Sequence, residues 1–136
     1  MGYRSDVHAV FYTTRKEELP LLKLYVDENF PDELRCHLGA IDSNRIYGYE
    51  MICENAKWYE SYPDVKAFNA FKDKYLALLD EPSTDKKWRY EFVQLGEETE
   101  ESLRLLGLSV SLLIECERSA KAEHVLSVSR RIETDY

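Results

Sequence analysis

The chain has 136 residues, of which 44% are hydrophobic and 32% charged, and this composition fits one folded domain over residues 1–136 rather than a disordered protein. The formal net charge of −8 argues against nucleic-acid binding, which needs clustered Lys and Arg to neutralise the phosphate backbone. There is no apolar run of the roughly 18 to 20 residues that span a bilayer and no signal peptide, so we expect a cytoplasmic protein without membrane contact. Three widely spaced cysteines indicate free thiols in a reducing compartment.

The first elements in chain order are a strand and a helix. Residues 6–13 carry apolar side chains on both faces, which predicts a strand in the middle of a sheet. Thr14 and Glu17 have the spacing of a capping box. The apolar repeat that follows predicts a regular helix from about residue 19 that ends before Pro31.

A second strand and a second helix follow. Residues 46–53 are rich in Tyr and Ile and predict a strand, which residues 56–59 extend after a kink. Ser61 is the expected N-cap of the next helix, with Pro63 in its first turn. Its expected buried stripe consists of Val65, Phe68, Phe71, Tyr75, Leu76 and Leu79.

The last third of the chain predicts three further strands. Residues 88–95 alternate as a strand, and residues 108–116 and 125–132 are expected to form a final antiparallel pair joined through residues 119–123. The apolar spacing within residues 102–113 also suits a helix, and that alternative stays open. The order of elements predicts an α+β fold, with a single, largely antiparallel sheet of about five strands and two helices packed on one face.

The sequence has no recognisable catalytic or metal-binding motif. The adjacent residues Cys36 and His37 diverge in most conformations, and a zinc site that also used Cys53 and Cys116 would lack the usual close ligand pair. The acidic residues 97–101 could hold Mg²⁺, although a solvated turn explains them as well. We therefore expect no catalysis, no cofactor and no metal.

Aromatic and acidic residues supply the candidate binding surface. Tyr and Trp concentrate in interfaces because they bury a large apolar area while keeping a polar group. The alternative role for Trp58 and Tyr62 is to fix the start of the second helix onto the sheet. The candidate protein-binding residues are Trp58, Tyr59, Tyr62, Glu97, Glu98, Glu100 and Glu101.

Four segments resemble a family of small proteins encoded by phages, prophages and other mobile elements. The opening Gly-Tyr-Arg-Ser-Asp-Val and the central Lys-Trp-Tyr-Glu-Ser-Tyr-Pro-Asp-Val are the most specific. The segments are residues 2–7, 57–65, 89–98 and 127–132. Residues 102–123 are longer and more hydrophobic than the corresponding part of that family. The resemblance implies a phage context and no reaction, and it brings no catalytic residues with it.

The function expected from these observations is that of a phage or prophage accessory protein, which binds a host or phage protein such as a host-defence or host-takeover target. Two alternatives remain, a small-molecule or nucleotide-binding module that uses exposed Tyr and Trp, and an enzyme with an unrecognised site. Homodimerisation through an exposed edge of the terminal strand pair is also left open.

Overall fold

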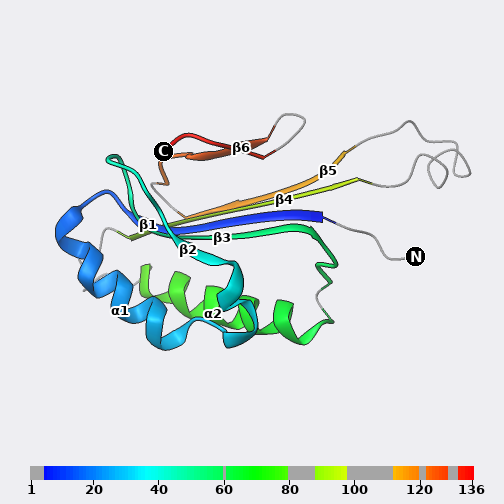
Figure 1. Cartoon of the computed structure of the whole chain (residues 1–136), viewed down its shortest axis with the longest axis horizontal. Helices are drawn as coiled ribbons and strands as arrows, with labels where there is room; N and C mark the ends of the chain where they lie inside the picture. The colour runs from blue at the N-terminus through cyan, green and yellow to red at the C-terminus, as the bar shows by residue number, and fades with distance from the viewer. Residues whose placement is uncertain (1–4, 60, 80–87, 98–111, 120–121, 129–131) are drawn as a thin grey trace, which may run out of the picture.

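A computed structural model describes residues 5–59, 61–79, 88–97, 112–119, 122–128 and 132–136. The main sheet has five antiparallel strands in the order β2-β3-β1-β4-β5, and β6 and β7 form a separate two-stranded sheet. The expected α+β fold, with an antiparallel sheet and two helices on one face, is confirmed (Figure 1). The elements are β1 (Ser5–Thr13), η1 (Lys16–Glu18), α1 (Leu19–Asn29), η2 (Asp32–His37), β2 (Leu38–Ala40), β3 (Tyr47–Ala56), α2 (Pro63–Leu79), β4 (Trp88–Glu97), β5 (Leu112–Arg118), β6 (Leu126–Val128) and β7 (Ile132–Thr134).

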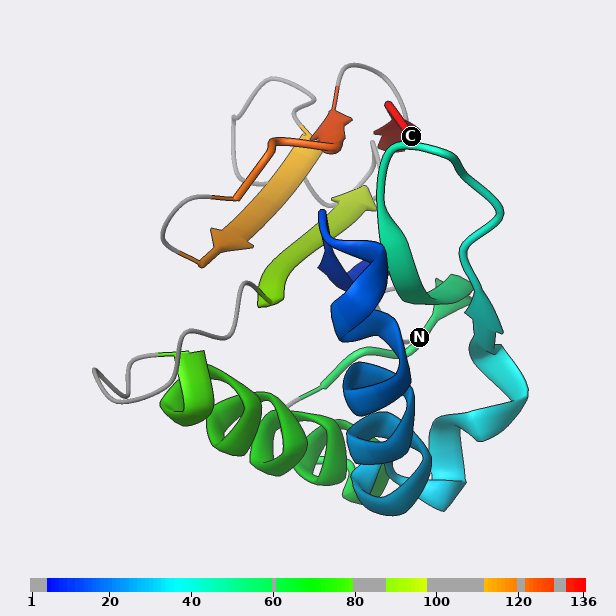
Figure 2. The ribbon, with the colours of Figure 1, turned by 90° about the vertical axis from the view of Figure 1, so that its left-hand side faces the viewer.

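Strand β1 is the centre of the sheet, as its apolar residues on both faces predict. It pairs with β3 along one edge and with β4 along the other. Phe11 belongs to the core on the helix side, whereas Val10 and Tyr12 belong to a second buried cluster with Val125 and Leu126. The helices therefore cover one face of the sheet and the β6–β7 hairpin covers part of the other (Figures 1 and 2).

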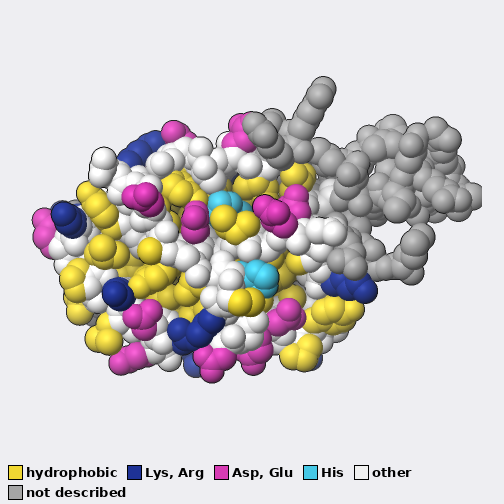
Figure 3. Space-filling model, viewed as in Figure 1, with side chains coloured by type: hydrophobic (Ala, Val, Ile, Leu, Met, Phe, Trp, Pro, Cys, Tyr) yellow, Lys and Arg dark blue, Asp and Glu magenta, His cyan; other side chains and the backbone are white. Residues whose placement is uncertain are grey.

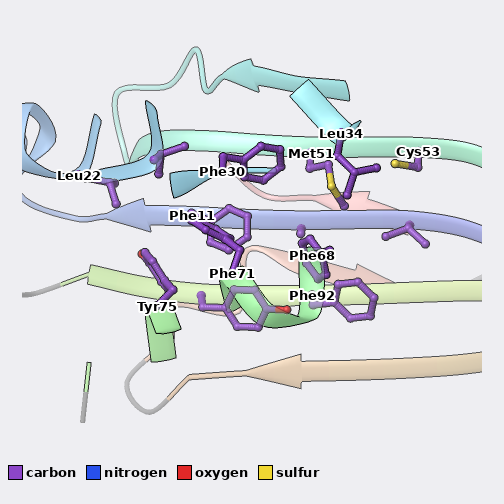
Figure 4. Packing of buried hydrophobic residues seen from close by; sticks show 14 of the residues in the cluster. Phe11, Leu22, Phe30, Leu34, Met51, Cys53, Phe68, Phe71, Tyr75 and Phe92 are labelled. Carbon is purple, nitrogen blue, oxygen red and sulfur yellow. The ribbon is translucent and has the colours of Figure 1, made fainter. Parts of the chain in front are cut away.

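The core on the helix side is built around Phe11. Its ring centroid lies 5.1 Å from that of Phe71, 5.2 Å from that of Tyr75 and 5.3 Å from that of Tyr90. Figure 4 shows side chains from both helices and from the sheet converging at this point. The predicted stripe of α2 is confirmed, because four of its members are buried and the other two pack against the same cluster, namely Val65, Phe68, Phe71, Tyr75, Leu76 and Leu79.

Helix α1 begins and ends where the sequence predicts, with Pro20 in its first turn. The predicted capping box is wrong, because neither η1 nor α1 has a side-chain cap. The chain leaves β1 through the 3₁₀ turn η1, so Thr14 lies ahead of the helix rather than at its first turn. The preceding Thr13 accepts the local hydrogen bond instead, from the Arg15 amide at 3.1 Å.

The predicted pairing of the last two strands is also wrong. Strand β5 pairs with β4, and β6 pairs with β7 after the chain turns back over the sheet. The alternation of apolar residues determines which side chains share a face, but it does not determine which strand lies alongside. Residues 102–111 lie outside the described part of the chain, so the choice between helix and strand there stays a prediction.

A matched pair of glycines tests how closely β3 packs against β1. Gly48 has a φ of +152°, and a Cβ there would lie 2.1 Å from the Phe11 carbonyl oxygen, whereas a Cβ at Gly39 would meet nothing within 4 Å. We expect Gly48→Ala to lower the free energy of unfolding by at least about 3 kcal/mol because of clash and strain. Gly39→Ala is the control and should change it by less than about 0.5 kcal/mol in urea denaturation followed by circular dichroism. Equal losses would contradict the close approach.

Candidate interaction surface and buried polar clusters

Two tyrosines form a fixed aromatic pair at the start of α2. The rings of Tyr59 and Tyr62 meet edge to face with centroids 5.1 Å apart. The Tyr62 amide donates to the Tyr59 carbonyl at 2.9 Å, and the Lys66 amide donates to the Tyr62 carbonyl at 2.9 Å. Tyr62 is 39% exposed and Tyr59 is half-buried. The pair is therefore held by backbone hydrogen bonds while one ring faces solvent.

Trp58 anchors this pair to the core. Its ring centroid lies 5.4 Å from that of Phe68 on α2 and 6.3 Å from that of Phe92 on β4. The side chain is half-buried. Trp58 thus fastens the start of α2 to the sheet, which is the alternative role that the sequence left open for it.

The acidic half of the predicted surface is not placed by the structure. Glu97 ends β4, and its side chain is not described. Glu98, Glu100 and Glu101 lie outside the described residues. The structure therefore brings together Trp58, Tyr59 and Tyr62, and the contribution of the four glutamates stays a prediction.

A fully buried carboxylate fastens the β6–β7 hairpin to the sheet. Glu91 on β4 is 0% exposed. It accepts a hydrogen bond from the Tyr12 hydroxyl at 2.6 Å, and bonds from the Val125 and Leu126 amides at 3.0 and 3.2 Å. The Arg118 guanidinium donates to the same carboxylate at 3.2 Å. A buried charge is tolerated only when it is paired and hydrogen-bonded, and these four donors satisfy Glu91.

Tyr12 extends this cluster to the loop before the hairpin. Its hydroxyl accepts a hydrogen bond from the Glu123 amide at 2.8 Å while donating to Glu91. Burial, together with the neighbouring Glu91 carboxylate, raises the pKa of Tyr12 well above its usual value, so the phenol stays neutral and keeps donating. Tyr90 is equally buried on the helix face, but its hydroxyl has no hydrogen-bond partner within the described part of the chain.

These two tyrosines predict opposite effects of the same substitution. Tyr12→Phe removes a hydroxyl that joins Glu91 to the Glu123 amide, so we expect the free energy of unfolding to fall by about 1 to 3 kcal/mol. Tyr90→Phe removes a buried hydroxyl that has no hydrogen-bond partner among the described residues, and it should leave that free energy unchanged or raise it by up to about 1 kcal/mol. Parallel urea denaturation of both variants measures the difference. A larger loss for Tyr90→Phe than for Tyr12→Phe would contradict this assignment.

A second polar cluster joins three segments on the same face of the sheet. Nε2 of His8 on β1 lies 3.3 Å from Glu50 Oε2 on β3 and 3.0 Å from the Tyr136 hydroxyl. The Tyr136 hydroxyl donates to Glu50. The hydrogen bond with His8 holds the pKa of the Glu50 carboxyl below its usual range, and burial raises the pKa of Tyr136.

The sequence did not predict either of the two polar clusters. Glu91 lies between Arg89 and Val93 on the face that the hairpin covers, and a lone acid in an alternating strand is ordinarily a solvent-facing residue. The only local signal for His8 was its position among the apolar residues of β1. The partners of these groups lie between 27 and 128 residues away, so local spacing could not reveal them.

The remaining cysteines and histidines do not converge. Cys36, Cys116, His37 and His124 are exposed, whereas Cys53 is buried. Over the described ranges, no group of three His, Cys, Asp or Glu side chains has an arrangement that could hold a metal ion. The zinc and Cys–His sites considered from the sequence are therefore not assembled in this part of the chain.

The three thiols should differ in reactivity. Burial raises the pKa of the Cys53 thiol to about 11, and its accessibility is also low. We expect Cys36 and Cys116 to react with iodoacetamide at pH 8 at rates typical of free thiols, and Cys53 to react at least about a hundredfold more slowly because the thiolate is the nucleophile. Peptide mass spectrometry over time measures all three rates, with urea-unfolded protein as the control. Equal rates in the folded protein would contradict the burial of Cys53.

Two observations on the described residues and one on the sequence complete the description. The longest described helix, α2, has 17 residues, and no helix in the described ranges combines the length and apolar character needed to cross a bilayer. Acidic and basic side chains are interspersed with hydrophobic ones over the face shown in Figure 3, rather than gathered into one charged patch. In comparisons with known proteins, no family model, curated protein or solved structure matches the chain.

Proposed function

We propose that this chain is an accessory protein that acts by binding another protein through the surface around Tyr62. The observation that supports this proposal is the Tyr59–Tyr62 pair. The ring centroids are 5.1 Å apart, and Tyr62 is 39% exposed. An exposed, preorganised tyrosine is a good binding residue because little side-chain entropy is lost when a partner covers it. The proposed location is the cytoplasm.

The way in which the pair is held supports this surface over other exposed apolar positions. Trp58 packs against Phe68 and Phe92, and the backbone bond from Tyr62 to Tyr59 closes the turn. Leu21 and Leu24 are more exposed, at 55% each, and are neighbours on one face of α1, but a pair of exposed aliphatic side chains is normal on a protein surface. The tyrosine surface combines exposure with a fixed geometry, which a specific interface requires.

The charge supports a protein partner over nucleic acid. A net charge of −8 repels a phosphate backbone, and the face in Figure 3 has no continuous basic area. Mimicry of DNA would require a dense array of carboxylates, whereas Lys and Arg are interspersed here. The resemblance of residues 2–7 and 57–65 to a phage and prophage family favours a host-defence or host-takeover protein as the partner.

The sheet gives less support to the alternative of a nucleotide-binding module. That alternative requires exposed sheet tyrosines on which a base can stack. Tyr12 and Tyr90 are fully buried, and Tyr47 and Tyr49 are half-buried. A thermal-shift screen with nucleotides tests it directly, because any ligand of the folded state raises the melting temperature.

The proposed function predicts that binding of the partner protein depends on Tyr62. Tagged protein is expressed in its own host and purified at physiological salt, and co-purifying proteins are quantified by mass spectrometry. Tyr62→Ala should reduce recovery of the specific partner at least about tenfold, since interface tyrosines commonly contribute 2 kcal/mol or more.

Tyr47→Ala is the matched control, because Tyr47 is a half-buried tyrosine at the opposite end of β3. It should leave the recovery of the partner unchanged. The proposal is abandoned if wild-type protein enriches nothing beyond itself, or if both variants lose the partner equally while remaining folded by circular dichroism.

A further inference from the structure

Three metal-ligating atoms from distant parts of the chain converge on one point. They are Nε2 of His8, Oε2 of Glu50 and the hydroxyl oxygen of Tyr136. The Nε2 atom lies 3.3 Å from the carboxylate oxygen and 3.0 Å from the phenol oxygen. This cluster differs from the groups of three His, Cys, Asp or Glu side chains considered above, because its third member is a tyrosine.

We propose that His8, Glu50 and Tyr136 form a three-ligand site for a divalent transition-metal ion such as Zn²⁺. Bonds of about 2.0 to 2.2 Å in tetrahedral geometry place neighbouring ligand atoms about 3.3 Å apart. The two separations from His8 are within 0.3 Å of that value, whereas the Tyr136 hydroxyl and the Glu50 carboxylate are in close hydrogen-bonded contact and must move apart to admit an ion. An ion at this point replaces the hydrogen bonds among the three groups, and the Tyr136 phenol releases its proton to solvent as its oxygen binds the ion. The inference is independent of the proposed protein-binding surface.

The ligands are held in place before any ion arrives. His8 pairs with Ile52 and Val10 pairs with Glu50 in the β1–β3 ladder, so the ligands His8 and Glu50 are diagonal neighbours on one sheet face. Next to Tyr136, the Asp135 amide donates to the Val125 carbonyl at 2.8 Å, and the Asp135 carboxylate accepts a hydrogen bond from Arg45 at 3.0 Å. Such supporting contacts reduce the cost of ordering the ligands.

One side of the cluster remains accessible. The His8 side chain is only 7% exposed, but that of Glu50 is 24% exposed. On β2, Gly39 is the residue paired with Glu50, and a Cβ built on it meets no heavy atom within 4 Å. This opening gives an ion a path to the site and leaves room for water as a fourth ligand. Three protein ligands with an open fourth position are typical of catalytic rather than structural zinc sites.

The ligand types indicate the class of ion. An imidazole nitrogen suits Zn²⁺, Cu²⁺, Ni²⁺ and Fe, whereas Mg²⁺ and Ca²⁺ prefer six or more oxygen ligands. Cys53 does not compete, since it is on the helix face of the sheet. The sequence alone predicted no metal, because the three residues are 42, 86 and 128 positions apart in pairwise separation.

The test is titration of chelator-treated, full-length protein with Zn²⁺ by isothermal titration calorimetry, with Co²⁺ as a spectroscopic substitute. We expect one equivalent to bind, and the visible absorption of Co²⁺ to show four- or five-coordinate geometry. Tyr136→Phe removes one ligand with minimal change in shape, and it should weaken Zn²⁺ binding at least about tenfold. The same substitution should also reduce the rise in melting temperature that Zn²⁺ causes, because the stabilisation by a ligand increases with its affinity for the folded protein.

Tyr47→Phe is the matched control, because it is the same substitution at a tyrosine of β3 that shares the helix-side face with Tyr49, opposite to the face of Glu50. It should bind Zn²⁺ as the wild type does, and Mg²⁺ should not compete in either protein. The proposal is overturned if wild-type protein binds no Zn²⁺ at about 100 μM, a concentration that saturates a micromolar site. It is equally overturned if Tyr136→Phe binds like the wild type, or if Tyr47→Phe loses as much affinity as Tyr136→Phe.

Discussion

The central strand β1 must be covered on both faces, and much of the architecture follows from that constraint. Phe11 on one face and Val10 and Tyr12 on the other are all fully buried. Two amphipathic helices cover the first face, which is the ordinary solution for an α+β domain. The second face is covered in part by a hairpin of two three-residue strands, too short to be stable alone in water. The hairpin therefore requires anchors on the sheet.

Glu91 is the main anchor, and it specifies position as well as attachment. Apolar contacts among Val10, Val125 and Leu126 would tolerate some sliding of the hairpin. A carboxylate that binds two consecutive amides, a phenol and a guanidinium does not, because any shift leaves a buried charge without partners. The second cluster, at His8, Glu50 and Tyr136, fixes the segment after β7 in the same way. Polar groups thus fix the position of the hairpin on the sheet, while apolar contacts keep the hairpin attached to it.

The sequence was sufficient for elements with a strong local period. Strand β1, helix α1 with its proline, and the buried stripe of α2 all follow from spacing and composition. The sequence was insufficient where partners are distant in the chain. Strand β5, for example, pairs with β4 and not with β6, the strand that follows β5 in the chain. The candidate surface shows the same division. Trp58, Tyr59 and Tyr62 were identified from composition, but only the structure separates the anchoring Trp58 from the exposed Tyr62. The two polar clusters depend on contacts between residues 27 or more positions apart, and no local pattern contains that information.

The central position of β1 also bears on how the protein is made. Strand β1 leaves the ribosome before both of its partners, β3 and β4, and 79 residues separate Tyr12 from its partner Glu91. Until β4 is synthesised, one edge of β1 remains unpaired, and the Tyr12 hydroxyl lacks its acceptor in the folded protein, Glu91. Non-local pairing of this kind slows folding, and unpaired edges promote association between chains. The completed sheet therefore forms only after β4 and β5 have been synthesised, and until then the nascent chain is more exposed to aggregation or to capture by chaperones.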